Sequence, residues 1–217
     1  MKIKGAIFDL DGTLLDSMPV WERFGERYLL SRGVAAPADL GDTLKAMSLP
    51  EAAAYFRETF GFAETQERIL AGFNELLARE YRERVFLKPH VQPFLQALER
   101  SGVKMCVATA TGREIAEEAL ERLGISRYFA FVITCADAGC GKDSPAVYQM
   151  ALARLGTKLK YTAVFEDALF AARTAKAAGF PVVGVADPST GADHGELARV
   201  ADEIIESFEE WMVESNA

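Results

Sequence analysis

The stretch that decides the fold is Ala6-Ile7-Phe8-Asp9-Leu10-Asp11-Gly12-Thr13, in which three apolar residues run directly into two acids and a glycine. A short apolar run bounded by a turn is typical of a buried strand. Open α/β sheets bind their ligands at the carboxyl ends of the strands. We therefore expect residues 6–8 to form a strand and the two acids to emerge at the functional edge of a sheet.

The same pattern recurs along the chain. Apolar runs followed by a loop and a segment of helical periodicity lie at residues 103–108, 131–135, 163–165 and 182–185. Alternating strands and helices predict a parallel α/β sheet, so we expect a Rossmann-like core. Three helix ends are also predicted: a capping box at Thr111 and Glu114, an N-terminus at Ser144-Pro145, and a C-terminus at Gly179.

Residues 17–85 break this alternation. They carry the helical stripes Trp21/Phe24/Tyr28 and Ile69/Phe73/Leu76/Leu77, with no convincing strand between them. We expect a helical cap domain at residues 17–85, inserted into an α/β core formed by residues 1–16 and 86–217. Pro89 marks the boundary at which the chain returns to the core.

Composition narrows the class of protein. The 217 residues can bury one substantial core plus a smaller domain, and the net charge of −8 without a basic stripe disfavours nucleic acid as a partner. The N-terminus lacks the apolar stretch of a signal peptide, and no run approaches the ~20 apolar residues of a membrane span. Cys106, Cys135 and Cys140 cannot all pair, so we expect structural thiols in a reduced, cytoplasmic monomer without a membrane partner.

Asp9 and Asp11 are separated by one residue and can serve one site. A carboxylate is a weak nucleophile, and a neighbouring carboxylate favours its protonation unless a divalent cation neutralises the pair. Mg²⁺ provides that neutralisation and prefers hard oxygen ligands. Gly12 allows a tight turn and Thr13 offers a hydroxyl and an amide to an anion. Alone, the stretch could also be a capped turn after a strand.

Further polar residues follow the later predicted strands. The Thr109 hydroxyl and the Ala110 amide could hold a phosphoryl oxygen. Lys142 precedes a predicted helix and could direct its ammonium at an oxyanion, while Glu166 and Asp167 are natural metal ligands. Each has an ordinary structural explanation: a loop start, a surface lysine, a helix cap. Four matches at successive strand ends favour a single active site.

At this point the sequence resembles a known family. The stretch D-x-D-G-T-L-x-D-S at residues 9–17, then Thr109, then Lys142, then Glu166-Asp167 resemble the four ordered motifs of haloacid dehalogenase superfamily hydrolases. The insert resembles the mobile cap of the subgroup that contains β-phosphoglucomutase and many small-metabolite phosphatases. The likeness spans the chain.

The resemblance implies a role for each motif residue. Asp9 would attack phosphorus, and Asp11 would protonate the leaving alcohol and then activate water. Thr109 and Lys142 would bind phosphate. Mg²⁺ would be held by Asp9, Asp167 and the Asp11 carbonyl, with Glu166 beside it. The chain departs from the commoner family pattern at positions that concern cap hinging and substrate positioning: His90, Asp143, Ala146 and Ala168.

Rival functions are separated by motif order and content. A phosphoacceptor receiver domain would place its lysine last, whereas Lys142 precedes Glu166-Asp167. A catalytically dead relative would be expected to have lost Asp9, Asp11 or Asp167, and a dehalogenase or a phosphonatase does not need Asp11. We therefore expect a phosphatase acting on a small phosphate monoester, such as a sugar phosphate.

The alternative is a phosphosugar mutase of the β-phosphoglucomutase type. Lys45 and Ser48 lie in a stretch that resembles the substrate-specificity loop of the capped subgroup. In the mutase-like cap an arginine follows that serine and a histidine lies shortly after the first motif. Here Leu49 and Trp21 stand at those positions, and neither can bind a second phosphate by charge.

Overall fold

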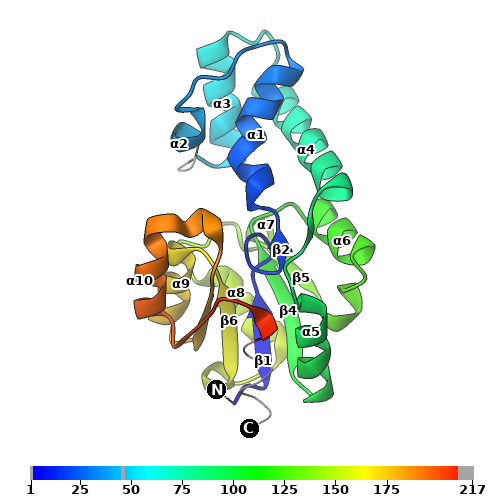
Figure 1. Ribbon diagram of the computed structural model, residues 1–217, viewed down its shortest axis with the longest axis vertical. Coiled ribbons are helices and arrows are strands. Elements are labelled where there is room, and N and C mark those ends of the chain that lie inside the picture. Colours follow the sequence, from blue (N-terminus) through cyan, green and yellow to red (C-terminus); the bar gives the residue numbers. More distant parts are fainter. Residues whose placement is uncertain (1, 45–46, 210–217) are drawn as a thin grey trace. The chain divides into compact units, whose positions relative to one another are not determined.

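The computed structural model describes residues 2–44 and 47–209. The chain divides into two compact units, one formed by Met1–Asp16 with Phe86–Ala217 and the other by Ser17–Val85 (Figure 1). We call them the core unit and the inserted unit. Within the described residues, no helix has both the length and the apolar character needed to cross a membrane.

The core unit is built on a six-stranded parallel sheet. Its strand order is β5 (Val132–Thr134), β4 (Lys104–Thr109), β1 (Gly5–Phe8), β6 (Thr162–Glu166), β7 (Val182–Val185) and β8 (Glu203–Ile205). The α/β class is confirmed, and the five predicted strands form within about one residue of their expected bounds. The prediction missed β8, a three-residue edge strand that begins with a glutamate and is too short to stand out as an apolar run.

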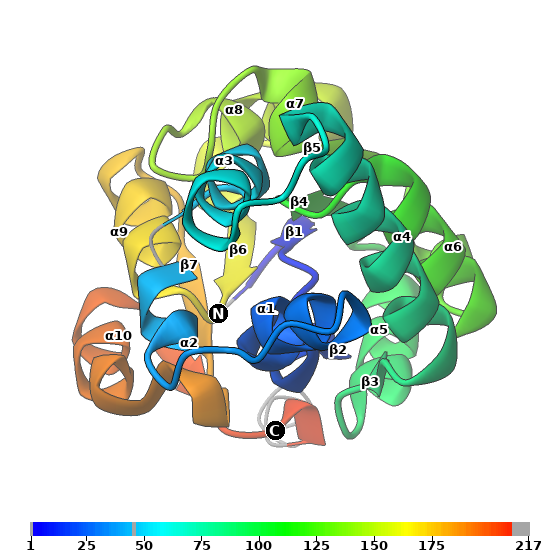
Figure 2. The same cartoon turned by 90° about the horizontal axis from the view of Figure 1, so that it is seen from above.

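The two faces of the sheet have separate cores because side chains alternate along a strand. Ile7 and Val164 belong to the cluster covered by α8 (Ala146–Leu155), α9 (Leu169–Ala177) and α10 (His194–Val200). Phe8 and Phe165 lie on the other face, stacked with 4.4 Å between ring centroids, and α5 (Val91–Arg100) brings Phe94 to 5.7 Å from Phe165. Figure 2 shows α8 and α9 on one side of β1 and β6 and α5 on the other.

Of the three predicted helix ends, one start was wrong, one start was off by one residue, and the C-terminal end was right. α6 (Arg113–Arg122) has Gly112 as its N-cap with no side-chain cap, so Thr111 forms no capping box. α8 begins at Ala146 with Pro145 as its N-cap, one residue later than expected. Gly179, at φ 87°, follows the end of α9 as predicted. Local sequence signals predicted where these helices lie, but the role of Thr111 depends on its tertiary contacts.

The described residues of the inserted unit contain helices only. These are α1 (Met18–Ser31), α2 (Leu40–Leu44), α3 (Leu49–Phe60) and α4 (Gln66–Glu83). Their shared core is aromatic: the ring centroid of Phe73 lies 4.5 Å from that of Tyr28, 4.8 Å from Phe24 and 5.2 Å from Phe56. Burial of each Phe side chain contributes about 1.5–3 kcal/mol, so this unit has a core of its own.

A two-stranded ribbon, which the sequence did not predict, lies where the core unit leads to and from the insert. β2 (Leu15–Asp16) pairs with β3 (Phe86–Leu87) in antiparallel fashion. The next residue, Lys88, donates its amide to the Leu14 carbonyl at 3.0 Å. Its ammonium lies 2.7 Å from Asp187 Oδ2 and 2.9 Å from the Ala186 carbonyl oxygen, with the two side chains 11% and 2% exposed. This buried pair fixes the ribbon to the segment after β7.

Lys88→Met should lower the free energy of unfolding by about 3–5 kcal/mol, because it leaves the Asp187 carboxylate buried without its partner. Burial alone would raise the pKa of Asp187, but hydrogen bonds from Lys88 and Ser189 lower it below its usual range. The pair therefore stabilises the fold above the unfolded pKa, and its contribution is lost as the pH falls through the folded value. Urea unfolding should show the difference between wild type and variant shrinking below about pH 3.9.

The matched control is Arg173→Met, which removes a pair with Glu196 whose side chains are 57% and 51% exposed. This substitution should cost less than about 1 kcal/mol. Equal losses in the two variants would contradict the importance assigned to the Lys88 pair.

Candidate active site

The carboxyl ends of the three central strands bring the predicted acids together. Asp9 follows β1 and donates its amide to the Phe165 carbonyl at 3.0 Å. Glu166 ends β6, and Thr109 ends β4 on the other side of β1. Since Phe8, the last residue of β1, pairs with both Val107 and Phe165, the three strands end within two residues of one another. The side chains at this edge all belong to the core unit.

Lys142 reaches this edge from the loop before α8 and is no surface lysine. Its ammonium pairs with Asp9 Oδ1 and Glu166 Oε1, and its side chain is 5% exposed. Burial acts to lower the pKa of Lys142, but the two carboxylates outweigh it and hold the pKa above its ordinary value. Lys142 is therefore a permanent positive charge inside the site.

Tyr148, which the sequence analysis did not single out, belongs to this network. Its hydroxyl, carried by α8, donates to Glu166 Oε1 at 2.9 Å. In the sequence Tyr148 sits in the apolar stretch of a helix and looks like an ordinary core residue. Glu166 thus accepts from both a phenol and an ammonium on one oxygen, which fixes its orientation.

Three buried carboxylates crowd together at the edge. Asp9, Glu166 and Asp167 each offer an oxygen within 4.8 Å of the others. Burial raises the pKa of Asp9 well above its ordinary value despite Lys142, and burial with the nearby Glu166 charge raises the pKa of Asp167 to about 7. Converging hard oxygen ligands with an excess of negative charge suit a divalent cation.

The turn that follows β1 uses its own polar groups differently from the prediction. Gly12 takes φ 76°, so it shapes the turn as expected. Its amide donates to the Leu15 carbonyl at 3.0 Å, within the turn itself. The Thr13 hydroxyl donates to Asp167 Oδ1 at 3.0 Å. It thereby orients the Asp167 carboxylate.

The loop after β4 contacts the second acid of the pair. Thr111 donates its hydroxyl to Asp11 Oδ2 at 2.6 Å and its amide to Thr109 Oγ1 at 3.0 Å. Thr109 is buried and, as a hydroxyl, can still donate while it accepts from Thr111. Ala110 lies exposed between the two threonines. Sequence reasoning assigned Thr111 to a helix cap and so missed its contact with Asp11.

The two residues predicted to set substrate specificity belong to the inserted unit. Lys45 lies outside the described residues. Ser48 is exposed and is the N-cap of α3: its hydroxyl accepts from the Glu51 amide at 3.4 Å, and Glu51 Oε2 accepts from the Ser48 amide at 2.7 Å. This capping box gives Ser48 a structural role that the prediction did not include.

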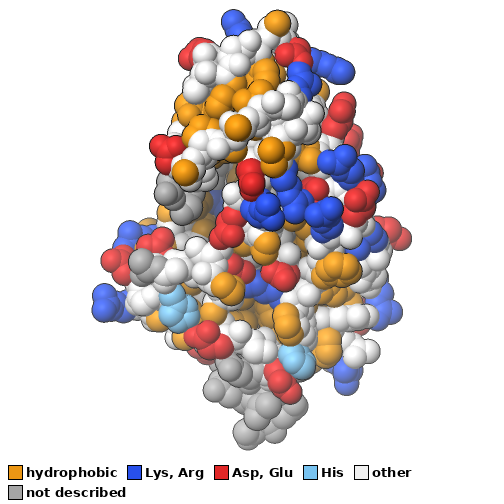
Figure 3. All heavy atoms as spheres, turned by 45° about the horizontal axis from the view of Figure 1, so that its top comes forward, with side chains coloured by type: hydrophobic (Ala, Val, Ile, Leu, Met, Phe, Trp, Pro, Cys, Tyr) orange, Lys and Arg blue, Asp and Glu red, His pale blue; other side chains and the backbone are white. Residues whose placement is uncertain are grey.

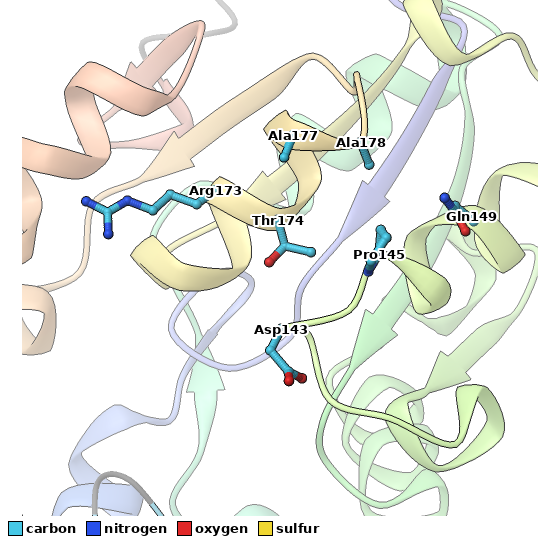
Figure 4. Close-up of a pocket in the computed structure, with 7 residues that line it drawn as sticks. All are labelled: Asp143, Pro145, Gln149, Arg173, Thr174, Ala177 and Ala178. Atoms are coloured by element: carbon cyan, nitrogen blue, oxygen red, sulfur yellow. The ribbon is translucent and has the colours of Figure 1, made fainter.

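A surface pocket and the two histidines of the core unit are separate from these acids. A pocket of about 410 Å³ opens between α8 and α9, lined by Asp143, Thr174 and neighbouring residues (Figure 4). The two histidines, pale blue in Figure 3, are 44% and 40% exposed and face Glu209 and Glu206.

Comparisons with known proteins agree with this geometry. The family profile of haloacid dehalogenase-like hydrolases matches residues 3–179. A phosphoglycolate phosphatase of Salmonella typhi is 32% identical over 229 aligned positions, covering 95% of this chain and 90% of the relative. A phosphorylated carbohydrates phosphatase of Thermotoga maritima is 27% identical, covering 82% of each chain.

Solved structures extend the likeness to the whole fold. The crystal structure of a provisionally named β-phosphoglucomutase from Thermotoga maritima superposes with a TM-score of 0.83 at 25% identity, covering 99% of this chain and all of the other. CbbY from Rhodobacter sphaeroides, solved with phosphate, has a TM-score of 0.79 at 24% identity over 96% of both chains. From the family match and the phosphatase relatives we conclude that this chain is a phosphohydrolase belonging to the haloacid dehalogenase-like hydrolases.

Proposed function

We propose that the chain is a Mg²⁺-dependent phosphatase that hydrolyses a small phosphate monoester through a phosphorylated Asp9. The observation that carries this proposal is the Asp9 carboxylate, held against Lys142 among Glu166 and Asp167 at the ends of the central strands. The names of the Salmonella and Thermotoga relatives, which refer to phosphoglycolate and to phosphorylated carbohydrates, support a substrate of this class.

In the first step an Asp9 carboxylate oxygen attacks phosphorus, and the bond from phosphorus to the leaving oxygen breaks. Asp11 donates a proton to that oxygen, so the alcohol leaves neutral. In the second step Asp11 accepts a proton from water, the water oxygen attacks phosphorus, and inorganic phosphate leaves with Asp9 restored. The Thr111 hydroxyl, bonded to one Asp11 oxygen, orients the acid for both proton transfers.

Lys142 and Thr109 are assigned to the transferring phosphoryl group. The Lys142 ammonium stabilises negative charge that develops on phosphoryl oxygens, and its pairing with Glu166 holds it in place beforehand. Thr109 and the Ala110 amide are donors at the neighbouring strand end. Because Lys142 is buried, its charge acts with little solvent screening.

The residues present fit a bound magnesium ion. Asp9 and Asp167 with the Asp11 carbonyl would hold it, with Glu166 beside them. When bound, Mg²⁺ supplies neutralisation of the carboxylates and of the phosphate oxygens. Burial is the main cause of the raised pKa values of Asp9 and Asp167, neighbouring carboxylates add to it, and a bound cation would favour the charged forms.

A phosphosugar mutase is the second candidate, favoured by the structural likeness to the provisionally named β-phosphoglucomutase. A mutase must also hold a second phosphate on the substrate, which requires a basic group in the inserted unit. Trp21 instead donates its indole N–H to the Tyr81 hydroxyl at 2.8 Å, and Leu49 is the first residue of α3. Neither offers charge, so we favour hydrolysis.

Removal of divalent cations should abolish turnover of an aryl phosphate, and added Mg²⁺ should restore it, because the carboxylates otherwise repel the substrate. Mg²⁺ should also raise the melting temperature of the wild type, since it relieves repulsion between buried acids. The rise should vanish in Asp167→Asn. Full turnover in excess chelator, with metal removal verified, would contradict the requirement.

Asp9→Asn should eliminate both turnover and the labelled phosphoenzyme, because an amide is not a useful nucleophile. Asp11→Asn should still form phosphoenzyme from substrates with good leaving groups, yet lose about 10²- to 10⁴-fold in turnover without acid/base help. Asp143→Asn is the matched control: Asp143 is an exposed acid next to Lys142 and should keep near wild-type activity. Label from substrate on any residue other than Asp9 would show that the nucleophile is misassigned.

With β-glucose 1-phosphate and a trace of the 1,6-bisphosphate, free phosphate should form faster than glucose 6-phosphate, because Leu49, and not an arginine that could hold a second phosphate, directly follows Ser48. The assay follows both products in one reaction. A parallel panel of phosphoglycolate and sugar phosphates ranks substrates by kcat/KM. Faster formation of glucose 6-phosphate would establish the mutase instead.

A further inference from the structure

Two of the three cysteines lie at the ends of one turn beside the active site. α7 (Cys135–Ala138) ends in Gly139, whose φ is 70°. The Gly139 amide donates to the Ala136 carbonyl at 3.2 Å, and the Cys140 amide to the Cys135 carbonyl at 3.3 Å. This pair of bonds defines a Schellman motif, in which the side chains at the positions of Cys135 and Cys140 commonly contact each other.

The turn is held in place on its other side. Thr134 and Asp137 form a capping box, with the Thr134 amide 2.7 Å from Asp137 Oδ2 and the Asp137 amide 3.2 Å from Thr134 Oγ1. Arg113 of α6 also donates to Asp137 Oδ2 at 2.7 Å. The backbone that carries the two cysteines is thus fixed at both ends, and their juxtaposition does not depend on a mobile loop.

Both cysteines are free and partly exposed. Burial is the main cause that raises the pKa of the Cys135 thiol, with Lys142 acting to lower it and with Asp9 and Cys140 raising it further. Cys106 differs, since it is fully buried in β4.

We propose that Cys135 and Cys140 form a reversible disulfide that switches the hydrolase off. A disulfide requires Cα atoms about 4.4–6.8 Å apart, and a turn closed by a backbone bond between the same two residues brings the backbones together on that scale. The oxidant is a low-molecular-weight disulfide such as oxidised glutathione. One cysteine thiolate displaces one glutathione thiol, and the second cysteine then displaces the other, so one protein disulfide forms and two small thiols are released.

The switch acts through Lys142, which follows Cys140 by two residues. A covalent S–S bond of about 2.05 Å is much shorter than a contact between two thiols, so closure draws Cys140 toward α7. Gly141 is the single residue between Cys140 and Lys142, so a displacement of the Cys140 backbone has a short path to the lysine. A shift of the Lys142 ammonium by about 1 Å from its pairs with Asp9 and Glu166 costs on the order of 10²-fold in rate.

Loss of activity on oxidation rests on the proposed function, whereas the disulfide itself does not. Trypsin releases residues 128–142 as one peptide that contains both cysteines, and residues 105–113 as a separate peptide with Cys106. After alkylation, the reduced 128–142 peptide carries two alkyl groups. The oxidised peptide carries none and lacks two hydrogens. The mass therefore reports the crosslink without any substrate.

The experiment treats the full chain with oxidised glutathione and measures peptide mass and aryl phosphate turnover in parallel. The wild type and Cys106→Ala should gain the crosslink, lose at least about tenfold in kcat on the scale of a displaced binding group, and recover with dithiothreitol. Cys135→Ser and Cys140→Ser should form no crosslink and keep their activity. These two variants separate the disulfide from any other effect of the oxidant.

Two results would overturn the proposal: absence of the 135–140 crosslink, including a glutathione adduct on one cysteine alone, or a complete crosslink with unchanged turnover. If the untreated protein hydrolyses no phosphate ester, the proposed function fails and the switch fails with it. The peptide mass then decides separately whether the disulfide forms.

Discussion

The candidate active site at the strand edge depends on one buried ammonium, that of Lys142. Lys142 joins the end of β1, through Asp9, to the end of β6, through Glu166, so three distant segments of the chain meet at one positive charge. Without it, Asp9, Glu166 and Asp167 would be like charges in a buried space and would protonate or separate. The same ammonium that stabilises the folded edge is the group suited to stabilise an anion there. The positive charge of Lys142 therefore serves both the fold of this edge and the proposed chemistry.

Three hydroxyls complete this arrangement, and each donates to a different acid. Tyr148 donates to Glu166, Thr13 to Asp167 and Thr111 to Asp11. These groups come from a helix, a turn and a loop, so their convergence is a property of the fold. Each hydrogen bond fixes one carboxylate oxygen and thereby sets the direction of the other. Neutral donors orient the acids without cancelling the negative charge that a cation requires.

Sequence predicts the acids well because their positions follow from local patterns. The apolar run at residues 6–8 and the strand before Glu166 could be recognised, and parallel strands bring their ends together. The hydroxyl partners could not be predicted, because Thr111 meets Asp11 across 100 residues and Tyr148 looks like core. The contact of the Thr13 hydroxyl with Asp167 could not be predicted either, because nothing local indicates that Asp167 lies beside it. β8 and the β2–β3 ribbon are too short to leave a pattern.

The core unit and the inserted unit have separate hydrophobic cores, so the acids and the surface of the inserted helices can vary separately. The core unit holds the acids, Lys142 and the three hydroxyls. An aliphatic cluster packs on one face of its sheet and aromatic rings pack on the other, which keeps the strand ends together. The inserted unit packs around Phe73 with its own rings, and Ser48 is committed to capping α3. Substitutions on the surface of those helices therefore need not disturb either hydrophobic core or the carboxylates. A strand edge that carries the acids, combined with a helical unit that has its own core, allows the surface of the helical unit to change without loss of the acids.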